Sequence, residues 1–178
     1  MNDPSLQFQQ LEANLERLRV QIPDLPVSSV ILSRLLIYLG RGMASILEQQ
    51  IRPFGLAEAE FRVLTTLMSQ PDGVAHPGEL CSSTSQSAAN MSRISDALVS
   101  RDLITRVLSQ HDRRKMVLRI TESGEELVRR LLPPLFGPLL EMFADFSEEE
   151  QRQLIAQLKR LGLKLHEAVA QDVPERAG

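Results

Sequence analysis

Apolar residues recur three and four positions apart along the first fifty residues of the chain. The first such series, over residues 8–22, predicts an amphipathic helix that prolines end. A second series predicts a helix over about residues 28–51, which Pro53 and Gly55 break. Its apolar stripe is broad, and we therefore expect this second helix to pack against more than one neighbour.

In the middle of the chain the patterns become shorter, and their period changes from that of helices to that of strands. The sequence Pro71-Asp72-Gly73 is typical of a turn, and Ser87 is a good helix N-cap. Two stretches rich in β-branched residues, separated by a charged tip, predict a hairpin. The expected elements are helices over residues 57–69, 79–84 and 87–101 and strands over residues 105–109 and 115–121.

The C-terminal part of the chain predicts two further helices. Thr121 can cap the first, but three prolines between positions 133 and 138 are expected to kink or interrupt it. The sequence from Ser147 to Glu150 is typical of a capping box that opens the last helix. We therefore expect N-terminal helices over residues 1–54, a compact middle domain over residues 55–121 and a C-terminal helical arm over residues 122–178.

The composition is that of a globular protein with a basic middle. Hydrophobic residues make up 43% of the 178, and a single cysteine cannot form an internal disulfide, which favours a reducing cytoplasm. We expect no signal peptide and no apolar stretch of membrane-spanning length. The net charge is −3, but residues 76–120 hold seven basic and four acidic residues, and so +3, which leaves −6 elsewhere. A basic module on an acidic body is typical of a DNA reader.

The order of helix, turn, helix and hairpin after residue 77 is that of a winged helix-turn-helix, which places one helix in the DNA major groove. We therefore expect a mainly α fold with a small β-hairpin wing and helical dimerisation arms at both ends. The apolar stripes of the arms need a partner, and a second copy of the chain is the simplest one. The alternative is that both arms fold back onto a monomer.

The helix over residues 87–101 is the expected recognition helix. Met91, Ile94 and Leu98 fall on one face and should anchor the helix to the core, which leaves the opposite face for DNA. Asparagine matches the donor and acceptor of adenine, and arginine can bind guanine or a phosphate. The expected DNA contacts in this helix are Ser87, Ala88, Ala89, Asn90, Ser92 and Arg93. The alternative is an ordinary solvated helix face.

The hairpin tip carries the basic run Arg113, Arg114 and Lys115 after Asp112. Like charges in a row repel one another and are favoured by nearby negative charge. Arginine at such a tip can also enter an A·T-rich minor groove. These three basic residues are therefore further expected DNA contacts, with a solvated charge run as the alternative.

These patterns resemble the MarR family of bacterial transcriptional regulators. The resemblance runs from about Gly55 to Leu131 and rests on Glu79-Leu80, Arg101-Asp102-Leu103-Ile104, Asp112-Arg113-Arg114 and Ile120-Thr121-Glu122-Ser123-Gly124. Other stretches, among them Leu132-Pro133-Pro134, look most like the MprA/EmrR branch of multidrug-efflux repressors. The chain departs from the family at Ala57, where a Thr or Ser cap is preferred, and at Ser85 and Asp102, where glycines are usual.

The resemblance implies a homodimer that binds a pseudo-palindromic operator in double-stranded DNA and represses a multidrug efflux operon. It also implies release from DNA by a small hydrophobic or phenolic effector that binds between the dimer arms and the reading domain. The residues that could line such a site are Arg34, Tyr38, Met43, Met68 and His76. Each of them could instead be a plain core or surface residue.

The sequence favours no catalytic chemistry. The three histidines lack metal-ligand spacing, no nucleophile is paired with a base and no glycine loop could cradle a phosphate. We therefore expect no metal, no cofactor and no enzyme activity, and Cys81 is interpreted as a small core residue rather than a redox sensor. The alternative to a ligand-responsive repressor is a dimeric ligand- or protein-binding module that keeps the winged fold without reading DNA.

Overall fold

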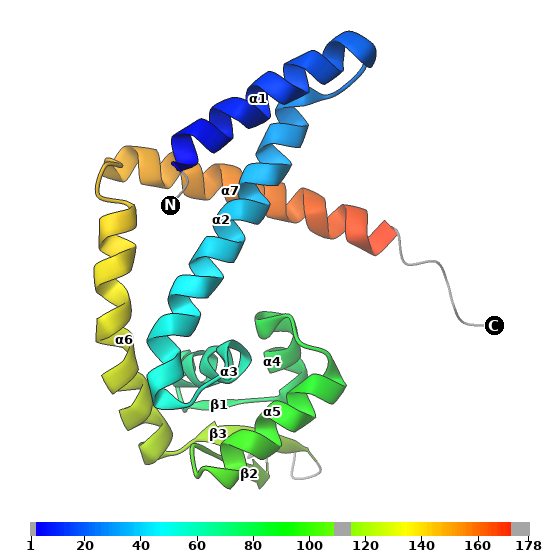
Figure 1. Cartoon of the computed structure of the whole chain (residues 1–178). Coiled ribbons are helices and arrows are strands. Elements are labelled where there is room, and N and C mark those ends of the chain that lie inside the picture. Colours follow the sequence, from blue (N-terminus) through cyan, green and yellow to red (C-terminus); the bar gives the residue numbers. More distant parts are fainter. Residues whose placement is uncertain (1–2, 109–114, 172–178) are drawn as a thin grey trace, which may run out of the picture. The chain divides into compact units, whose positions relative to one another are not determined.

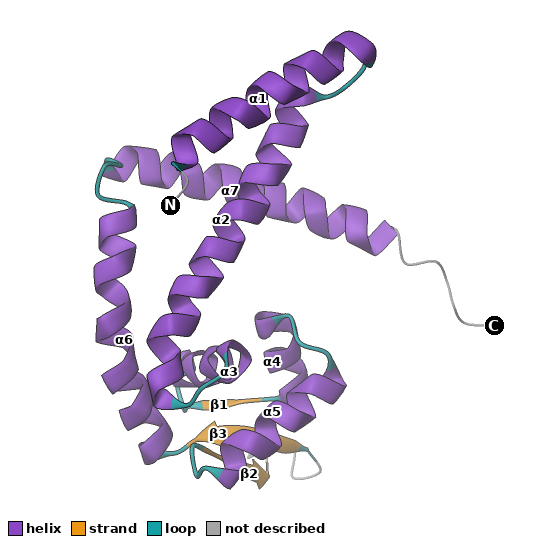
Figure 2. Ribbon diagram, in the orientation of Figure 1, coloured by secondary structure: helices purple, strands orange, loops and turns teal. Residues whose placement is uncertain are grey.

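The computed structural model of the protein describes residues 3–108 and 115–171 (Figure 1). The chain is mostly helical with one small antiparallel sheet, which confirms the expected fold class (Figure 2). The elements in chain order are α1 (Pro4–Gln21), α2 (Val27–Ile51), the 3-10 turn η1 (Arg52–Phe54), α3 (Glu58–Ser69), β1 (Val74–Ala75), α4 (Pro77–Thr84), α5 (Ala88–Ser100), β2 (Ile104–Leu108), β3 (Met116–Ile120), α6 (Glu122–Met142) and α7 (Glu148–Gln171).

The chain forms two compact units, Met1–Leu131 and Leu132–Gly178. The first unit holds the elements from α1 to β3 together with the first half of α6. The second holds the rest of α6 and α7. The division into three parts that the sequence suggests stays a prediction.

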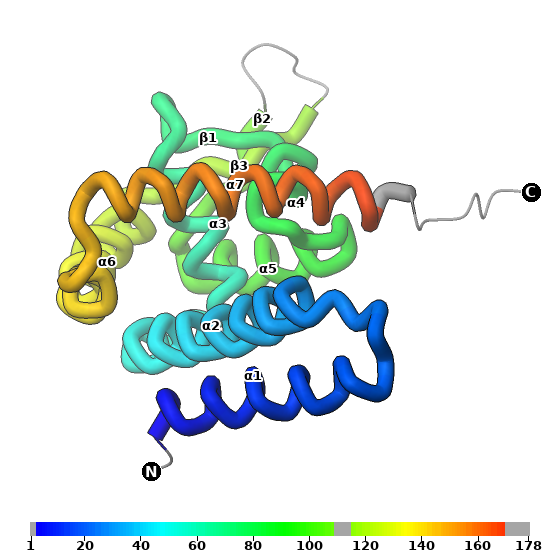
Figure 3. The backbone as a smooth tube through the Cα atoms, turned by 90° about the horizontal axis from the view of Figure 1, so that it is seen from above, coloured from blue at the N-terminus to red at the C-terminus, as the bar shows by residue number. Residues whose placement is uncertain are grey.

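Helices α1 and α2 lie side by side within the first unit (Figure 3). Leu15 of α1 is buried, and the ring of Phe8 packs edge-on against that of Tyr38 with 5.4 Å between the ring centroids. Most of the remaining apolar surface of α2 stays uncovered in the single chain, as the exposed side chains of Leu32, Ile37 and Leu39 show. The broad apolar stripe of α2 is therefore only partly used by α1.

Helix α2 and the turn after it, Val27–Phe54, are long and apolar enough to cross a membrane by length and composition alone. The expectation that no stretch of the chain reaches this length was therefore wrong. Between positions 27 and 47 only Arg34 and Arg41 carry charge. A run of this length with two charges is still apolar enough to span a membrane. Length and composition do not separate a membrane span from an apolar helix that a protein partner covers.

The middle of the first unit is built around α3, whose Val63, Leu64 and Leu67 are fully buried. This helix packs against α4, α5 and the sheet (Figure 1). The sheet has the order β1-β3-β2, and the hairpin pairs Ile104 with Ile120 and Leu108 with Met116. Strand β1 was not expected from the sequence, because two residues are too few to show an alternating pattern.

Three helices begin with the caps that the sequence predicts. The Ser87 hydroxyl accepts a hydrogen bond from the Asn90 N–H at 3.2 Å, and Thr121 Oγ1 accepts one from the Gly124 N–H at 3.0 Å. Before α7 the N–H of Ser147 donates to the Glu150 carboxylate at 2.8 Å. Each cap satisfies N–H groups that the first turn of a helix otherwise leaves without a partner.

The Ser147 cap also sets the charge state of Glu150. Hydrogen bonds from the Ser147 hydroxyl and backbone hold the pKa of the Glu150 carboxyl below its ordinary value. A depressed pKa in the folded state means that the charged form contributes stability above the ordinary pKa. This contribution is lost as the pH falls through the lowered value, so the cap is complete at neutral pH.

Among the described residues, two that are not glycine, both at positions where the family usually has glycine, adopt left-handed backbone conformations. Ser85 has φ 55° at the end of α4, and Asp102 has φ 56° after α5. Ser85 allows the Gln86 N–H to return to the Cys81 carbonyl at 2.9 Å, which closes the helix end. Small polar side chains can hydrogen-bond locally and therefore tolerate this region better than most residues.

Helix α6 continues through Pro133, Pro134 and Pro138, so of the two expected effects, a kink or an interruption, the interruption did not occur. A proline inside a helix removes the hydrogen bond to the carbonyl four residues earlier. Arg129 and Arg130 occupy the positions four residues before the first two prolines, and both residues are exposed. Water can therefore satisfy the freed carbonyls, which lowers the cost of the two prolines.

Gly124 allows the start of α6 to approach the strand residues closely. A Cβ atom at this position would lie 2.2 Å from the Leu103 carbonyl oxygen and 2.9 Å from the Ile120 side chain. We expect Gly124→Ala to lower the free energy of unfolding by about 1–3 kcal/mol or more, because backbone must move to make room. Urea unfolding followed by circular dichroism measures the change.

Gly78→Ala is the matched control, because nothing lies within 4 Å of its added Cβ and the position is in the first turn of α4. It should be neutral or slightly stabilising, since alanine in a helix is favoured over glycine by roughly 0.5–1 kcal/mol. Equal stability of the two variants would contradict the close approach at Gly124.

Candidate nucleic-acid interface

Helix α5 has one buried face and one exposed face, as the apolar spacing predicts. Met91 and Leu98 are 1% and 0% exposed, and Ile94 is also buried. On the other side of the helix, residues Ala89, Arg93, Asp96 and Ser100 are exposed. The helix is thus fixed to the core by its apolar side and presents small, polar and charged residues to solvent.

Ser95 is the one buried side chain of α5 that the sequence does not mark as core. Its hydroxyl donates to the Met91 carbonyl at 2.7 Å, so the polar group is satisfied within the helix. The position lies next to Ile94 and Leu98 on the anchoring face, and a larger side chain there would push α5 away from its neighbours. Helical spacing alone could have identified this residue, because position 95 is four residues after Met91.

The N-terminal end of α5 is open to solvent. Ser87, Ala88 and Ala89 are exposed, and the two alanines have no side chain beyond Cβ to keep a large ligand at a distance. The first amides of a helix point outward and carry partial positive charge. A phosphate or a base edge could therefore come close to the backbone at this end.

A chain of hydrogen bonds connects the turn before α5 to the exposed face of the helix. The guanidinium of Arg93 donates to Asn90 Oδ1 at 2.9 Å. The amide of Asn90 donates in turn to Gln86 Oε1, and Gln86 Nε2 donates to the Thr84 carbonyl at 3.2 Å. Asn90 and Arg93 were expected at the interface, whereas Gln86 was not, because the sequence places it in the turn.

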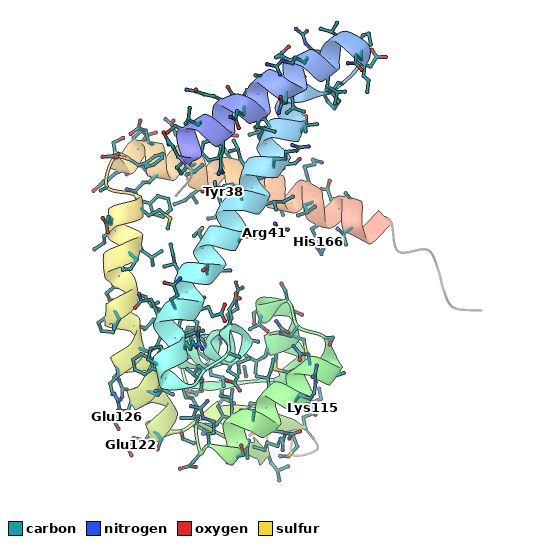
Figure 4. All side chains as sticks on the ribbon, viewed as in Figure 1. Tyr38, Arg41, Lys115, Glu122, Glu126 and His166 are labelled. Carbon is teal, nitrogen blue, oxygen red and sulfur yellow. The ribbon has the colours of Figure 1, made fainter. Side chains whose placement is uncertain are left out.

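The wing is tied to α5 by an ion pair. Arg106 of β2 binds the Asp96 carboxylate on the exposed face of the helix. Lys115 precedes β3 and is exposed (Figure 4). The other two basic residues expected at the wing tip, Arg113 and Arg114, lie outside the described residues. In the described part of the wing, Arg106 therefore faces α5, and Lys115 adds an exposed cation next to the start of β3.

Arg101, at the C-terminal end of α5, connects this helix to the turn after α2. Its guanidinium donates to the Gly55 carbonyl at 2.7 Å and to the Phe54 carbonyl at 3.1 Å. It also lies 3.7 Å from the carboxylate of Glu60, which in turn accepts a hydrogen bond from the Ala57 N–H. One side chain thus joins segments that are about 46 residues apart in sequence.

The same contacts explain how α3 starts without the usual cap. Ala57 has no side chain that could accept a hydrogen bond, and the Glu60 carboxylate binds the Ala57 N–H from within the first turn at 2.9 Å. Glu60 thus supplies half of a capping box, and Arg101 holds it in place. The sequence marks Ala57 as a departure from the family, and the compensation comes from Glu60 within α3, which Arg101 after α5 holds in place.

The five residues expected to contact an effector lie on two helices and in the link between β1 and α4. Arg34, Tyr38 and Met43 are exposed on α2, whereas Met68 of α3 and His76 before α4 are half-buried. Arg34 and Tyr38 are one helical turn apart. In the part of the chain that the structure describes, no hydrogen bond, ion pair or ring contact joins any two of the five. One open hollow of about 340 Å³ is lined by residues of α1, the α1–α2 turn and the first turn of α2, and includes none of them.

Arg41 was not expected from the sequence and falls on the same stripe of α2 as Tyr38. Positions 34, 38 and 41 follow the four and three spacing of one helix face, and all three residues are exposed. Figure 4 labels Tyr38 and Arg41 on α2. Among the described residues, neither arginine has a recorded carboxylate partner. The face therefore combines two cations with one phenol.

Comparison with known sequences identifies a family signature in the middle of the chain. A sequence model described as the MarR family matches residues 54–115, which run from the end of η1 to the start of β3. The chain is also 33% identical over 131 residues to the transcriptional repressor MprA of Escherichia coli (strain K12), with 74% of each chain covered.

Solved structures share the fold. BpsR of Bordetella bronchiseptica, whose DNA binding is regulated by 6-hydroxynicotinic acid, has a TM-score of 0.64 at 22% identity, covering 73% of this chain and 91% of that one. A mutant of MarR from Escherichia coli complexed with operator DNA has a TM-score of 0.66 at 22% identity, covering 78% and 98%.

The Arg101 contacts predict a measurable loss of stability in a variant that lacks them. We expect Arg101→Ala to lower the free energy of unfolding by roughly 1–2 kcal/mol, because two backbone carbonyls lose a charged donor. Chemical denaturation measures this loss. Arg129→Ala removes only an exposed pair with Glu125 one helical turn away and should cost no more than about 0.5 kcal/mol. Similar losses in the two variants would show that the Arg101 bridge contributes nothing beyond an ordinary surface pair.

Proposed function

The chain belongs to the MarR family of transcriptional regulators, and from this we propose that it is a ligand-responsive homodimeric repressor that binds a pseudo-palindromic operator. The observation that carries the proposal is the position of α5 in the winged helix-turn-helix. Its apolar face is buried, and its opposite face is exposed next to the wing. A helix held in this way can enter a major groove while a hairpin reaches the neighbouring groove.

The DNA contacts are proposed to come from the exposed start of α5 and from the wing. In α5 small residues allow close approach, and Arg93 supplies a donor for guanine or phosphate. In the wing Arg113 and Arg114 add charge by sequence, and Lys115 is exposed at the start of β3. The full set is Ser87, Ala88, Ala89, Asn90, Ser92, Arg93, Arg113, Arg114 and Lys115.

The partner of the apolar arms is proposed to be a second copy of the chain. The exposed large apolar residues of the C-terminal helix α7 are Leu154, Ile155, Leu158, Leu161, Leu163, Leu165 and Val169. Soluble monomers rarely leave an apolar surface of this extent uncovered. In a dimer with two-fold symmetry, the same apolar surface of each subunit is covered by the other subunit. The dimer also presents two recognition helices, one for each half of a palindrome. In such a dimer, the exposed apolar side chains of α2 would pack against protein and not against lipid.

The effector is proposed to be a small hydrophobic or phenolic compound. The stripe of Arg34, Tyr38 and Arg41 on α2 offers cations and a phenol to a phenolate or carboxylate, and apolar neighbours on the same helix offer hydrophobic contact. Met43, Met68 and His76 remain proposed contacts. The relative MprA is named a repressor, and control of a multidrug efflux operon in the cytoplasm is the corresponding proposal for this chain.

Operator binding is tested by fluorescence anisotropy on DNA from upstream of the gene and on duplexes selected from a random library, with excess nonspecific competitor. At about 0.15 M salt pure phosphate attraction is weak, so tight binding indicates sequence recognition. We expect tight binding. Failure on the selected library as well would favour a ligand- or protein-binding module on a winged fold.

The wing is proposed to contribute mainly positive charge. Removing one of its charges should therefore change how DNA affinity depends on salt. We expect Arg114→Ala to weaken binding and to lower the slope of log K against log salt by about one if the side chain neutralises one phosphate. Arg62→Ala is the control, because this exposed arginine lies in α3, outside the proposed contact set, and pairs only with Glu58 of its own helix among the described residues. An unchanged slope and affinity in Arg114→Ala would remove the wing from the interface.

Tyr38→Phe tests the effector site without disturbing packing, since the ring that meets Phe8 is retained. We expect a phenolic compound to release wild-type protein from operator DNA and to need a higher concentration with the variant. Reciprocity requires DNA to weaken effector binding by the same factor, which calorimetry can check. Equal responses of both proteins to all phenols tested would exclude the Tyr38 hydroxyl from effector contact.

A further inference from the structure

Gln86 stands at the centre of the polar chain at the start of α5, and neither spacing nor charge in the sequence gives it a function. It lies in the turn between α4 and α5, outside both helices. Both ends of its side-chain amide have protein partners, Asn90 on one side and the Thr84 carbonyl on the other. The side chain is half-buried, so it is held rather than free in solvent.

The direction of the hydrogen bonds in this chain is fixed at both ends. A backbone carbonyl can only accept, and an arginine guanidinium can only donate. Starting from Arg93, each group therefore donates to the next, through Asn90 and Gln86 to the carbonyl of Thr84. Reversing either amide would place donor against donor or oxygen against oxygen. The chain thus has a single satisfied arrangement.

The arrangement changes what Asn90 can do. Its oxygen already accepts from Arg93, one of its N–H groups already binds Gln86, and its backbone N–H binds the Ser87 hydroxyl. These bonds hold the amide in one orientation and leave one lone pair and one N–H of the side chain free. Asn90 therefore holds Arg93 in addition to any contact that its free lone pair and N–H make with DNA.

Arg93 keeps most of its donors for DNA. A guanidinium has five N–H groups, and Asn90 occupies one of them. The side chain is exposed on the face of α5 opposite the buried residues. An arginine held in one orientation loses less conformational freedom on binding than a free one, and immobilising such a side chain otherwise weakens binding by about two- to tenfold.

We propose that Gln86 is a specificity-determining positioning residue, which acts through Asn90 to aim Arg93 at a guanine of the operator. Guanine presents two acceptors in the major groove that match an arginine fork. The proposal rests on the proposed function, because it requires the chain to read DNA. It assigns Gln86 no contact with DNA of its own.

The test compares wild type with Gln86→Ala on an operator selected by the wild-type protein, on copies with each base pair replaced in turn, and on nonspecific duplex. We expect Gln86→Ala to bind the operator about three- to tenfold more weakly and nonspecific DNA almost unchanged. The lost discrimination should fall at the same guanine as the discrimination that Arg93→Ala loses. Ser69→Ala is the matched control, since this exposed hydroxyl at the end of α3 donates to the Thr66 carbonyl within its own helix and lies outside α5 and the wing.

A double variant separates action through Arg93 from an independent effect. If Gln86 works by holding Arg93, adding Gln86→Ala to Arg93→Ala should change operator affinity little. Independent, additive losses would overturn the proposal. An equal loss on operator and nonspecific DNA would overturn it too, because that result indicates a general structural role.

Misfolding of the variant and failure of the proposed function can each be told apart from failure of the proposal on Gln86. If Gln86→Ala does not fold, as thermal unfolding shows, Asn90→Ala breaks the same chain at the next group and must produce the same loss at the same guanine. Unchanged discrimination in a folded variant would overturn the proposal. Failure of the wild-type protein to select any operator would instead refute the proposed function, and it would do so before any variant is measured.

Discussion

Burial of one apolar face of α5 is the interaction on which the rest of this structure depends. Met91, Ile94 and Leu98 pack into the core around α3, and a fully buried side chain of this size contributes about 1.5–3 kcal/mol. Because these residues fix the rotation of the helix, they also decide which residues face solvent. The exposed arginine, the small N-terminal residues and the ion pair to the wing all follow from that one orientation.

Polar contacts then connect this helix to the elements on either side of it. Arg101 joins the end of α5 to the turn after α2, and Arg106 joins the hairpin to Asp96. The exposed Arg106–Asp96 pair alone contributes little stability, whereas the Arg101 hydrogen bonds to two backbone carbonyls contribute more. Both sets of contacts also fix position, because a displacement of α2 or of the wing must either break them or move α5. The helix that would read DNA is therefore connected to the helix that carries the proposed effector stripe.

Much of this arrangement could be predicted from sequence because it is local. Helical spacing identified the anchoring face of α5, and the caps at Ser87, Thr121 and Ser147 follow from single side chains and the turn after them. Strand β1 is too short to give a pattern. The Arg101 bridge and the close approach of Gly124 to Leu103 join distant segments, and no local rule gives them. The continuous α6 depends on solvent reaching carbonyls, which the prolines alone do not disclose.

The most direct test of the account is photo-crosslinking from the exposed start of α5. A photoreactive amino acid replaces Ala89, and the same group at Ser69, exposed at the end of α3, is the control. With a selected operator bound, we expect position 89 to crosslink to bases of the major groove and position 69 to give no crosslink to DNA. Tight operator binding without any crosslink from position 89 would contradict the claim that this face of α5 reads DNA.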